Sequence, residues 1–181
     1  DNLSKAIPKL PLVQFASASA DESRLLVFAG SDNDPGRYYL YDKKSRQLNE
    51  IMLVRPQLER VSLAKVTPVS YPAADGVAVP AYLTLPPGSD GKGLPGIVLP
   101  HGGPSARDEW GFDWLAQFLA NQGYAVLQPN YRGSDGFGDA WLQQNGFRSW
   151  QTSIGDVSAG AKWLVGQGIA DPDKLAMLGW S

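Results

Sequence analysis

The stretch Lys174-Leu175-Ala176-Met177-Leu178-Gly179-Trp180-Ser181 decides the fold class of this chain. Its apolar run Leu175–Leu178 is typical of a strand buried in a sheet. Gly179-Trp180-Ser181 then matches the first half of a G-x-S-x-G nucleophile elbow, a sharp turn that lifts a serine hydroxyl above the end of a strand. The sequence therefore predicts a buried strand followed by an exposed serine. The helix that normally follows such an elbow would lie beyond Ser181, so we expect Leu175 and Met177 to be exposed on one side. We also expect the isolated chain to aggregate or to need a complementing segment, and to need that C-terminal segment for activity.

The composition excludes several classes of function. The 181 residues are 43% hydrophobic and 19% charged, with a net charge of −2 and no basic run longer than Lys43-Lys44. We therefore expect neither a nucleic acid nor a membrane as partner. The chain has no cysteine and a single histidine, His101, which excludes disulfides, thiolate sites and multi-histidine metal sites. We expect no metal and no cofactor, and the compartment stays open.

Residues 1–60 are predicted to form antiparallel strands. Arg24–Gly30, Arg37–Asp42 and Gln47–Val54 are strand-like and are separated by polar turn sequences. A meander of this kind fits either a blade of a β-propeller or a small independent sheet. Arg55 to Ala64 is expected to be a linker or a short helix.

Residues 61–181 change to an α/β pattern. Strands are expected at Val66–Tyr71, Val77–Leu85, Gly96–Leu99, Tyr124–Leu127 and Lys174–Leu178, and Pro80 suggests an edge position for the second of them. One helix is expected between Trp110 and Asn121, with apolar residues at 114, 115, 118 and 119. A second helix carries Ile154, Val157, Ala161, Leu164 and Val165 on one face, with Asp156 in its first turn. This alternation predicts crossover units and a parallel sheet.

Three unusual loops leave the carboxyl ends of these strands, where ligands bind in an open parallel sheet. They are His101-Gly102-Gly103-Pro104, Asn130-Tyr131-Arg132-Gly133-Ser134 and Gly179-Trp180-Ser181. If the predicted sheet forms, the three loops converge in space, and this agreement is more specific than any one motif.

The first and last of these loops contain the candidate catalytic groups. A tetrahedral intermediate needs backbone N–H donors aimed at its oxyanion, and Gly102 or Gly103 would supply one, with Pro104 stiffening the exit of the loop. Ser181 would be the nucleophile. His101 is either a general base or, as we prefer, a residue that orders the glycine loop. Taken singly, Ser181 could be a surface serine and the Gly-Gly-Pro sequence an ordinary turn.

The candidate substrate contacts are Tyr131, Arg132 and Trp180. Arg132 could face a carboxylate or carbonyl of a substrate. Alternatively, and as we prefer, it could bond loop carbonyls and hold the three loops together.

Together, these motifs resemble the prolyl oligopeptidase family of serine peptidases, especially its acylaminoacyl-peptidase and dipeptidyl-aminopeptidase-like bacterial branch. The resemblance rests on Ile97–Pro104, Phe118–Leu127, Asn130–Ser134 with Gly136–Gly138, and Gly168–Pro172 leading to Ser181. It covers about 110 residues in matching order, and residues 1–60 resemble the closing strands of the family's β-propeller more weakly. The resemblance implies an α/β-hydrolase domain, here its N-terminal half in residues 61–181, preceded in residues 1–60 by the last propeller strands and a linker.

The resemblance also implies the roles of residues. Ser181 would be the nucleophile, and Gly103, with Gly102 and His101 beside it, would form the oxyanion loop of a peptidase that cleaves short peptides. The triad aspartate and histidine of the family have no counterpart here, so we expect the 181 residues alone to be inactive. A carboxylesterase or lipase on the same fold, or a non-catalytic interaction module, stays open, and so does self-association.

Overall fold

The computed structural model describes residues 2–103, 105–144 and 146–181, without the side chains of residues 146–148. Contacts between residues divide the chain into two compact units. One unit contains the chain up to Leu63 together with Gly111–Asp113, and the other contains Ala64–Trp110 and Trp114–Ser181. Each unit is described separately below.

The first unit is a four-stranded antiparallel meander in the order β1-β2-β3-β4. Its strands are β1 (Leu12–Ala18), β2 (Arg24–Gly30), β3 (Arg37–Asp42) and β4 (Gln47–Leu53). The bounds expected for β2 and β3 are confirmed, and β4 ends one residue earlier than expected. The prediction missed β1, because its sequence LVQFASA leaves five of seven side chains exposed and lacks an apolar face.

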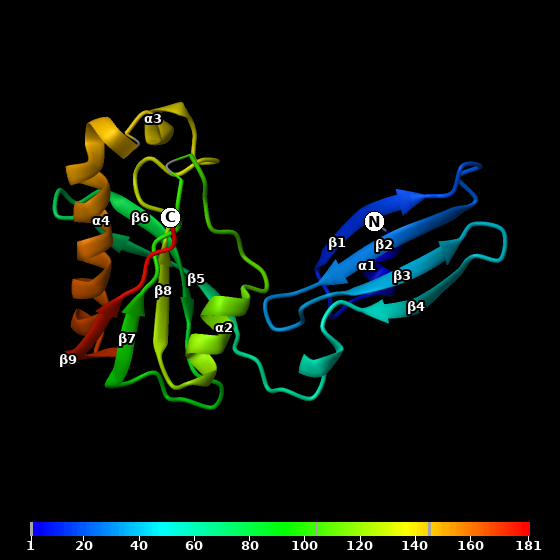
Figure 1. Cartoon of the computed structure of the whole chain (residues 1–181), viewed down its shortest axis with the longest axis horizontal. Helices are drawn as coiled ribbons and strands as arrows, with labels where there is room; N and C mark the ends of the chain where they lie inside the picture. The colour runs from blue at the N-terminus through cyan, green and yellow to red at the C-terminus, as the bar shows by residue number, and fades with distance from the viewer. Residues whose placement is uncertain (1, 104, 145) are drawn as a thin grey trace. The chain divides into compact units, whose positions relative to one another are not determined.

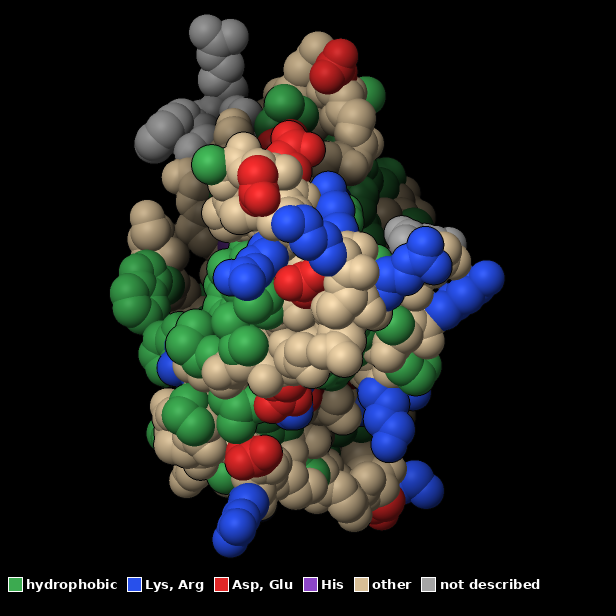
Figure 2. Space-filling model, turned by 90° about the vertical axis from the view of Figure 1, so that its right-hand side faces the viewer, with side chains coloured by type: hydrophobic (Ala, Val, Ile, Leu, Met, Phe, Trp, Pro, Cys, Tyr) green, Lys and Arg blue, Asp and Glu red, His purple; other side chains and the backbone are tan. Residues whose placement is uncertain are grey.

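Short helical segments flank this sheet. The helix α1 (Asn2–Ala6) precedes Ile7 and Leu10, which pack against Ala29 in a small core. The 3₁₀ turn η1 (Pro56–Leu58) lies within the segment expected to be a linker or short helix, and this prediction is confirmed. Figure 2 shows basic and acidic side chains interspersed on the face that it presents, as the small net charge suggests.

The second unit contains a five-stranded mixed sheet in the order β5-β6-β8-β7-β9. Its strands are β5 (Val66–Pro72), β6 (Ala78–Thr84), β7 (Leu94–Val98), β8 (Ala125–Pro129) and β9 (Ala170–Met177). β7 pairs in parallel with both β8 and β9, while β5, β6 and β8 pair antiparallel. The predicted parallel crossovers are therefore confirmed.

The edge position that Pro80 suggested for β6 is wrong, because β6 lies between β5 and β8. The Pro80 carbonyl accepts a hydrogen bond from the Asn130 N–H at 2.8 Å, one residue past the end of β8. Proline has no N–H to donate to β8 at this position. Because the position is at the end of the β6–β8 pairing, the missing hydrogen bond disturbs the sheet least there.

Two helices cover opposite faces of this sheet (Figure 1). α2 (Trp114–Asn121) contributes Ala116 to a core with Ile97, Leu99 and Val126, whereas α4 (Gly146–Gly166) contributes Val157 and Leu164 to a core with Val98 and Leu127. Consecutive strand residues point to opposite faces, so Ile97 and Val98 contact different helices. A short helix, α3 (Asp139–Leu142), precedes α4. None of the helices in the described ranges is long and apolar enough to cross a membrane.

The buried face of α2 differs from the predicted stripe. Trp114 and Phe118 are 51% and 55% exposed, whereas Ala116, Gln117 and Ala120 are buried. Gln117 is tolerated there because its side-chain amide bonds both the N–H and the carbonyl of Ala64, at 2.7 and 2.8 Å. On α4, Val157 and Leu164 are buried as expected, but Ile154 is 53% exposed.

The order β8-β7-β9 creates a topological switch point. From β7 the chain moves through α2 to β8 on one side, and then through α4 to β9 on the other side. The loops that follow β7 and β8 therefore lead to helices on opposite faces of the sheet, and open α/β sheets bind ligands beyond the carboxyl ends of their strands where the strand order reverses in this way. On β9, Leu175 and Met177 are 39% and 56% exposed, as expected from the sequence.

Candidate active site

Ser181 stands on a strained turn after β9. The Leu178 N–H still donates to the Val98 carbonyl at 3.0 Å, and the chain then turns through Gly179 and Trp180. Ser181 has a φ of +72°, a backbone conformation that residues other than glycine rarely adopt. Strain of this kind collects at functional sites, and it is the conformation that a nucleophile elbow requires of its serine.

The glycine loop after β7 lies directly against this turn. A Cβ atom placed on Gly102 would lie 2.6 Å from the Trp180 carbonyl oxygen, 2.8 Å from the Ser181 Cβ and 3.3 Å from the Ser181 Oγ. Only glycine allows this approach. Gly103 has a φ of +145°, which also favours glycine. The structure thus brings Gly102 and Ser181 together; Pro104, expected to stiffen the loop, lies outside the described residues.

His101 does not hydrogen-bond to Ser181 in the described contacts. Its Nδ1 lies 2.7 Å from the Gly102 carbonyl oxygen, and its Nε2 lies 2.7 Å from the Ser134 Oγ. Burial lowers the pKa of His101, and the positive charge of Arg107 lowers it further. Both ring nitrogens are therefore engaged in holding loops, which favours the ordering role over that of a general base.

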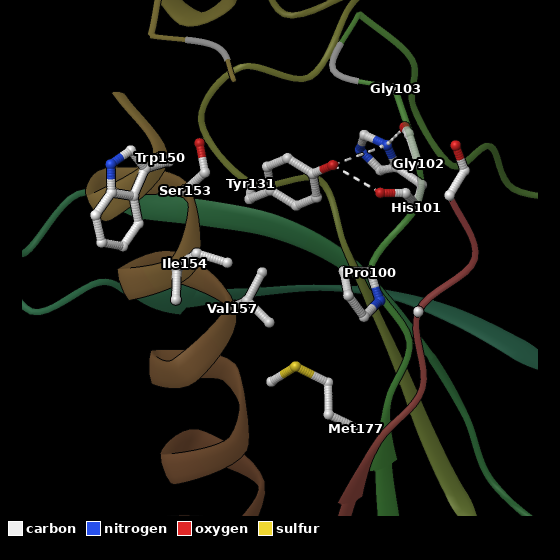
Figure 3. Close-up of a pocket in the computed structure, with 12 residues that line it drawn as sticks. Pro100, His101, Gly102, Gly103, Tyr131, Trp150, Ser153, Ile154, Val157 and Met177 are labelled. Atoms are coloured by element: carbon white, nitrogen blue, oxygen red, sulfur yellow. Dashed lines mark hydrogen bonds between the residues drawn. The ribbon is translucent and has the colours of Figure 1, made fainter. Parts of the chain in front are cut away.

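Tyr131 braces the glycine loop from the loop after β8. Its hydroxyl donates to the His101 carbonyl at 2.7 Å, and its ring stacks on the imidazole with centroids 4.4 Å apart and an interplanar angle of 15°. Figure 3 shows this hydroxyl directed at His101. Burial raises the pKa of Tyr131, and the charge of Asp108 adds to the shift. The phenol therefore stays a hydrogen-bond donor at neutral pH.

Arg132 is not available to a substrate, which corrects one of its two expected roles. Its guanidinium bonds Asp156 at 2.7 Å and Asp75 at 2.6 Å, and its side chain is 9% exposed. These hydrogen bonds, that of Asp156 first, raise the pKa of Arg132 above its ordinary value. The alternative is also corrected in detail, because Arg132 bonds two carboxylates rather than loop carbonyls.

Asp156 also differs from its predicted place in the first turn of a helix. It lies in the middle of α4, is fully buried and accepts hydrogen bonds from the backbone N–H and the guanidinium of Arg132. The prediction failed because the stripe that marks this helix begins well after its first residue, Gly146. A buried carboxylate needs such a cation as partner.

A cavity of about 500 Å³ opens beside these groups (Figure 3). Gly102, Gly103, His101, Tyr131 and Ser181 line one part of it. The remaining wall is mostly apolar and comes from α4, β9 and the start of the glycine loop: Pro100, Trp150, Ser153, Ile154, Val157, Met177 and Gly179. Sequence reasoning missed this wall, because exposed apolar residues on a helix give no signal of what they face.

Trp180, a candidate substrate contact, does not line this cavity. It is 68% exposed and meets Trp114 edge to face, with centroids 6.4 Å apart. Arg132 is absent from the lining as well, so Tyr131 is the candidate substrate contact that the structure keeps at the cavity. Within the described ranges, no three His, Asp or Glu side chains are grouped so as to hold a metal ion.

Several known proteins are similar to this chain in sequence. The sequence model of the prolyl oligopeptidase family matches residues 110–181. Dipeptidyl aminopeptidase BIII of Pseudoxanthomonas mexicana is 35% identical over 93% of this chain and 26% of its own length. Dipeptidyl peptidase family member 6 of Caenorhabditis elegans is 34% identical over the same shares of the two chains. The chain thus spans about a quarter of the length of these relatives.

Solved structures agree with these matches. A puromycin-hydrolyzing peptidase of Mycobacterium tuberculosis superposes with a TM-score of 0.73 and 28% identity, covering 88% of this chain and 25% of its own. The acylaminoacyl peptidase of Pyrococcus horikoshii gives a TM-score of 0.71 at 21% identity, covering 92% and 27%. The chain belongs to the prolyl oligopeptidase family.

Proposed function

We propose that the intact gene product is a serine peptidase of the acylaminoacyl- or dipeptidyl-peptidase type, with Ser181 as its nucleophile. The observation that carries this proposal is the positive φ of Ser181 at a switch point, with Gly102 packed against it so closely that no side chain fits. The names of the relatives support the substrate class of short peptides.

The proposed reaction begins with attack of the Ser181 Oγ on a peptide carbonyl. The Oγ–C bond forms, and the negative charge that develops on the former carbonyl oxygen is stabilised by the N–H of Gly103, with Gly102 beside it. The C–N bond then breaks as the proton taken from the Oγ passes through a base to the leaving amine. Water cleaves the acyl-serine in the second half of the reaction and regenerates the hydroxyl.

The base of this reaction is not His101. Both of its ring nitrogens hold other groups, and it is the single histidine of the 181 residues. We therefore assign the base and the acid that orients it to polypeptide outside these residues, and expect the 181 residues alone to lack activity.

The first unit has the proposed role of a propeller blade. Four consecutive strands paired antiparallel in chain order are what one blade of a β-propeller contains. Phe15 and Ile51, on the two outer strands β1 and β4, are exposed apolar side chains of the kind that a neighbouring blade would cover.

The test is active-site labelling of the intact gene product with a fluorophosphonate. We expect one modified serine, identified by peptide mass spectrometry as Ser181, and no labelling of Ser181→Ala. Because a triad nucleophile is indispensable, Ser181→Ala should lose about 10⁴-fold or more in kcat. Ser89→Ala, in the loop between β6 and β7 where the half-buried hydroxyl accepts a hydrogen bond from the Gly91 N–H, is the control. An active protein whose Ser181 stays unlabelled would contradict the proposal.

The substrate class is tested by comparing an acyl-alanine anilide and a dipeptidyl anilide with a simple acyl ester. A peptidase should hydrolyse one of the two anilides. Hydrolysis of the ester alone would favour a carboxylesterase on the same fold.

A further inference from the structure

The contacts of the His101 ring determine which of its nitrogens carries the proton. Nδ1 lies 2.7 Å from the Gly102 carbonyl oxygen, which can only accept a hydrogen bond, so Nδ1 donates. Nδ1 also lies 3.3 Å from the Tyr131 hydroxyl, but that hydroxyl donates its one proton to the His101 carbonyl oxygen at 2.7 Å. Since burial lowers the pKa of His101, the ring is neutral at and above pH 7 and has one N–H. Nε2 is then a bare acceptor, and the Ser134 hydroxyl 2.7 Å away must donate to it.

The Ser134 hydroxyl has one proton and two neighbours that can accept it, the His101 Nε2 and the Tyr131 carbonyl oxygen, and we assign this proton to Nε2, which has no other donor among the described contacts. The hydroxyl also lies 2.7 Å from the Tyr131 carbonyl oxygen, but that oxygen already accepts the Trp141 indole N–H at 3.1 Å and the Ser134 backbone N–H at 2.9 Å. Turning the hydroxyl toward His101 therefore leaves no carbonyl unsatisfied. Ser134 is fully buried, so its 2.7 Å approach to an imidazole is not a second nucleophile–base pair.

The hydrogen bond from the His101 Nδ1 fixes the orientation of the Gly102–Gly103 peptide as well as that of the imidazole ring. The peptide between Gly102 and Gly103 is planar and trans, so its C=O and N–H point in opposite directions. Holding the Gly102 oxygen against the imidazole turns the Gly103 N–H away from it. Two successive glycines would otherwise leave this peptide free to rotate.

We propose that Ser134 is a positioning residue, which holds His101 in its Nδ1–H form and thereby fixes the Gly102–Gly103 peptide with the Gly103 N–H toward the reacting carbonyl. The inference rests on the proposed function for the identity of that carbonyl. The alternative hydrogen-bond pattern, with the proton on Nε2, would set the bare Nδ1 against the Gly102 oxygen and release the peptide.

The test combines ¹⁵N NMR of the histidine ring with kinetics on the intact gene product. The His101 signals are identified by their loss in His101→Asn. In the unmodified protein we expect a protonated Nδ1 and a bare Nε2 above pH 7, and in Ser134→Ala a mixture of the two forms. The kcat of Ser134→Ala should fall about tenfold with KM little changed, because the lost bond orients a donor used in the transition state.

Two His101 variants separate positioning from folding. In His101→Asn the side-chain amide replaces Nδ1 and can still donate to the Gly102 oxygen, whereas in His101→Gln it reaches toward Ser134 instead. We expect His101→Asn to retain more kcat than His101→Gln, and Ser134→Ala to have no further effect in the His101→Asn background. Tyr71→Phe removes another buried hydroxyl, which donates to the Asp156 carbonyl at 2.8 Å, and should change neither the ring signals nor kcat.

The outcomes separate the two proposals. A protonated Nε2 in the unmodified protein, or equal kcat in Ser134→Ala, would overturn the positioning role. Absence of any turnover in the unmodified protein would instead contradict the proposed function, and the ring signals would still decide the tautomer.

Discussion

The loops after β7 and β8 are hydrogen-bonded to each other and are built in opposite ways. The loop after β7 presents bare backbone at Gly102 and Gly103, and a side chain at Gly102 would collide with the turn that carries Ser181. The loop after β8 buries Asn130, Arg132 and Ser134, which are 1%, 8% and 0% exposed and are all hydrogen-bonded. Bare backbone can approach a reacting group but cannot hold its own shape. The second loop supplies the side chains that hold the first.

The largest expected effect is on the anchor of the β8 loop. Asp156→Asn removes the charge that faces the buried guanidinium of Arg132, whose remaining carboxylate partner is the more exposed Asp75. Breaking a buried ion pair from one side costs about 3–5 kcal/mol, which urea unfolding would measure. Lys174→Gln, which breaks a surface pair of 3.5 Å with Asp171, should change the free energy of unfolding by less than about 0.5 kcal/mol. Equal effects of the two variants would contradict the anchoring role.

A change at the bare loop should affect activity rather than stability. Gly102→Ala would place its Cβ 2.6 Å from the Trp180 oxygen and 2.8 Å from the Ser181 Cβ, so one of the two loops must move. A displacement of about 1 Å costs about 10²-fold in rate, and we expect at least this loss in kcat.

The control for this variant is Gly155→Ala on α4, where an added Cβ meets nothing within 4 Å. Alanine in a helix should leave activity unchanged and stabilise the protein by about 0.5–1 kcal/mol. If Gly102→Ala kept full activity, the close approach of the two loops would have no role in the reaction.

The sequence predicted the glycine loop after β7 better than the loop after β8 that holds it. Gly102, Gly103 and Ser181 belong to local motifs, and the structure brings Gly102 into contact with Ser181 as expected. The partners of Arg132 come instead from positions 57 residues before it and 24 residues after it. No local pattern distinguishes such a buried pair from ordinary surface charges, so the sequence places Asp156 in the first turn of a helix and gives no sign of its pairing with Arg132.

The difference between local motifs and contacts distant in sequence also explains the other wrong predictions. β2 and β3 were predicted with correct bounds because their apolar residues are local to each strand. β1, the interior position of β6 and the exposed Trp114 and Phe118 depend on which segments lie beside them. Tertiary contacts decide these features, and no short stretch of a single sequence shows which tertiary contacts it will make.

A smaller effect is expected where the two loops touch. Tyr131→Phe removes the hydroxyl that donates to the His101 carbonyl at 2.7 Å and keeps the ring that stacks on the imidazole. One hydrogen bond contributes about 1 kcal/mol, so kcat should fall about fivefold. Tyr124→Phe, just before β8 at its opposite end, is the control. A loss as large as that of Gly102→Ala would mean that Tyr131 itself contacts the substrate.

The smallest effect is expected at Asp75, on the turn between β5 and β6. Its side chain is 55% exposed, and the hydrogen bond from Arg132 lowers its pKa. A carboxylate whose pKa is lower in the folded than in the unfolded protein stabilises the folded state. This contribution is complete above the carboxylate's pKa in the unfolded protein, about 3.9, and is lost as the pH falls through its pKa in the folded protein. Asp75→Asn should therefore lower Tm slightly at pH 7, and the difference from the unmodified protein should disappear as the pH falls below the lowered pKa of Asp75. Asp90→Asn, in another exposed turn, controls for the loss of one surface charge. If Asp75→Asn destabilised the protein as much as Asp156→Asn, the β8 loop would depend equally on both of its carboxylates, and the buried one would not be its main anchor.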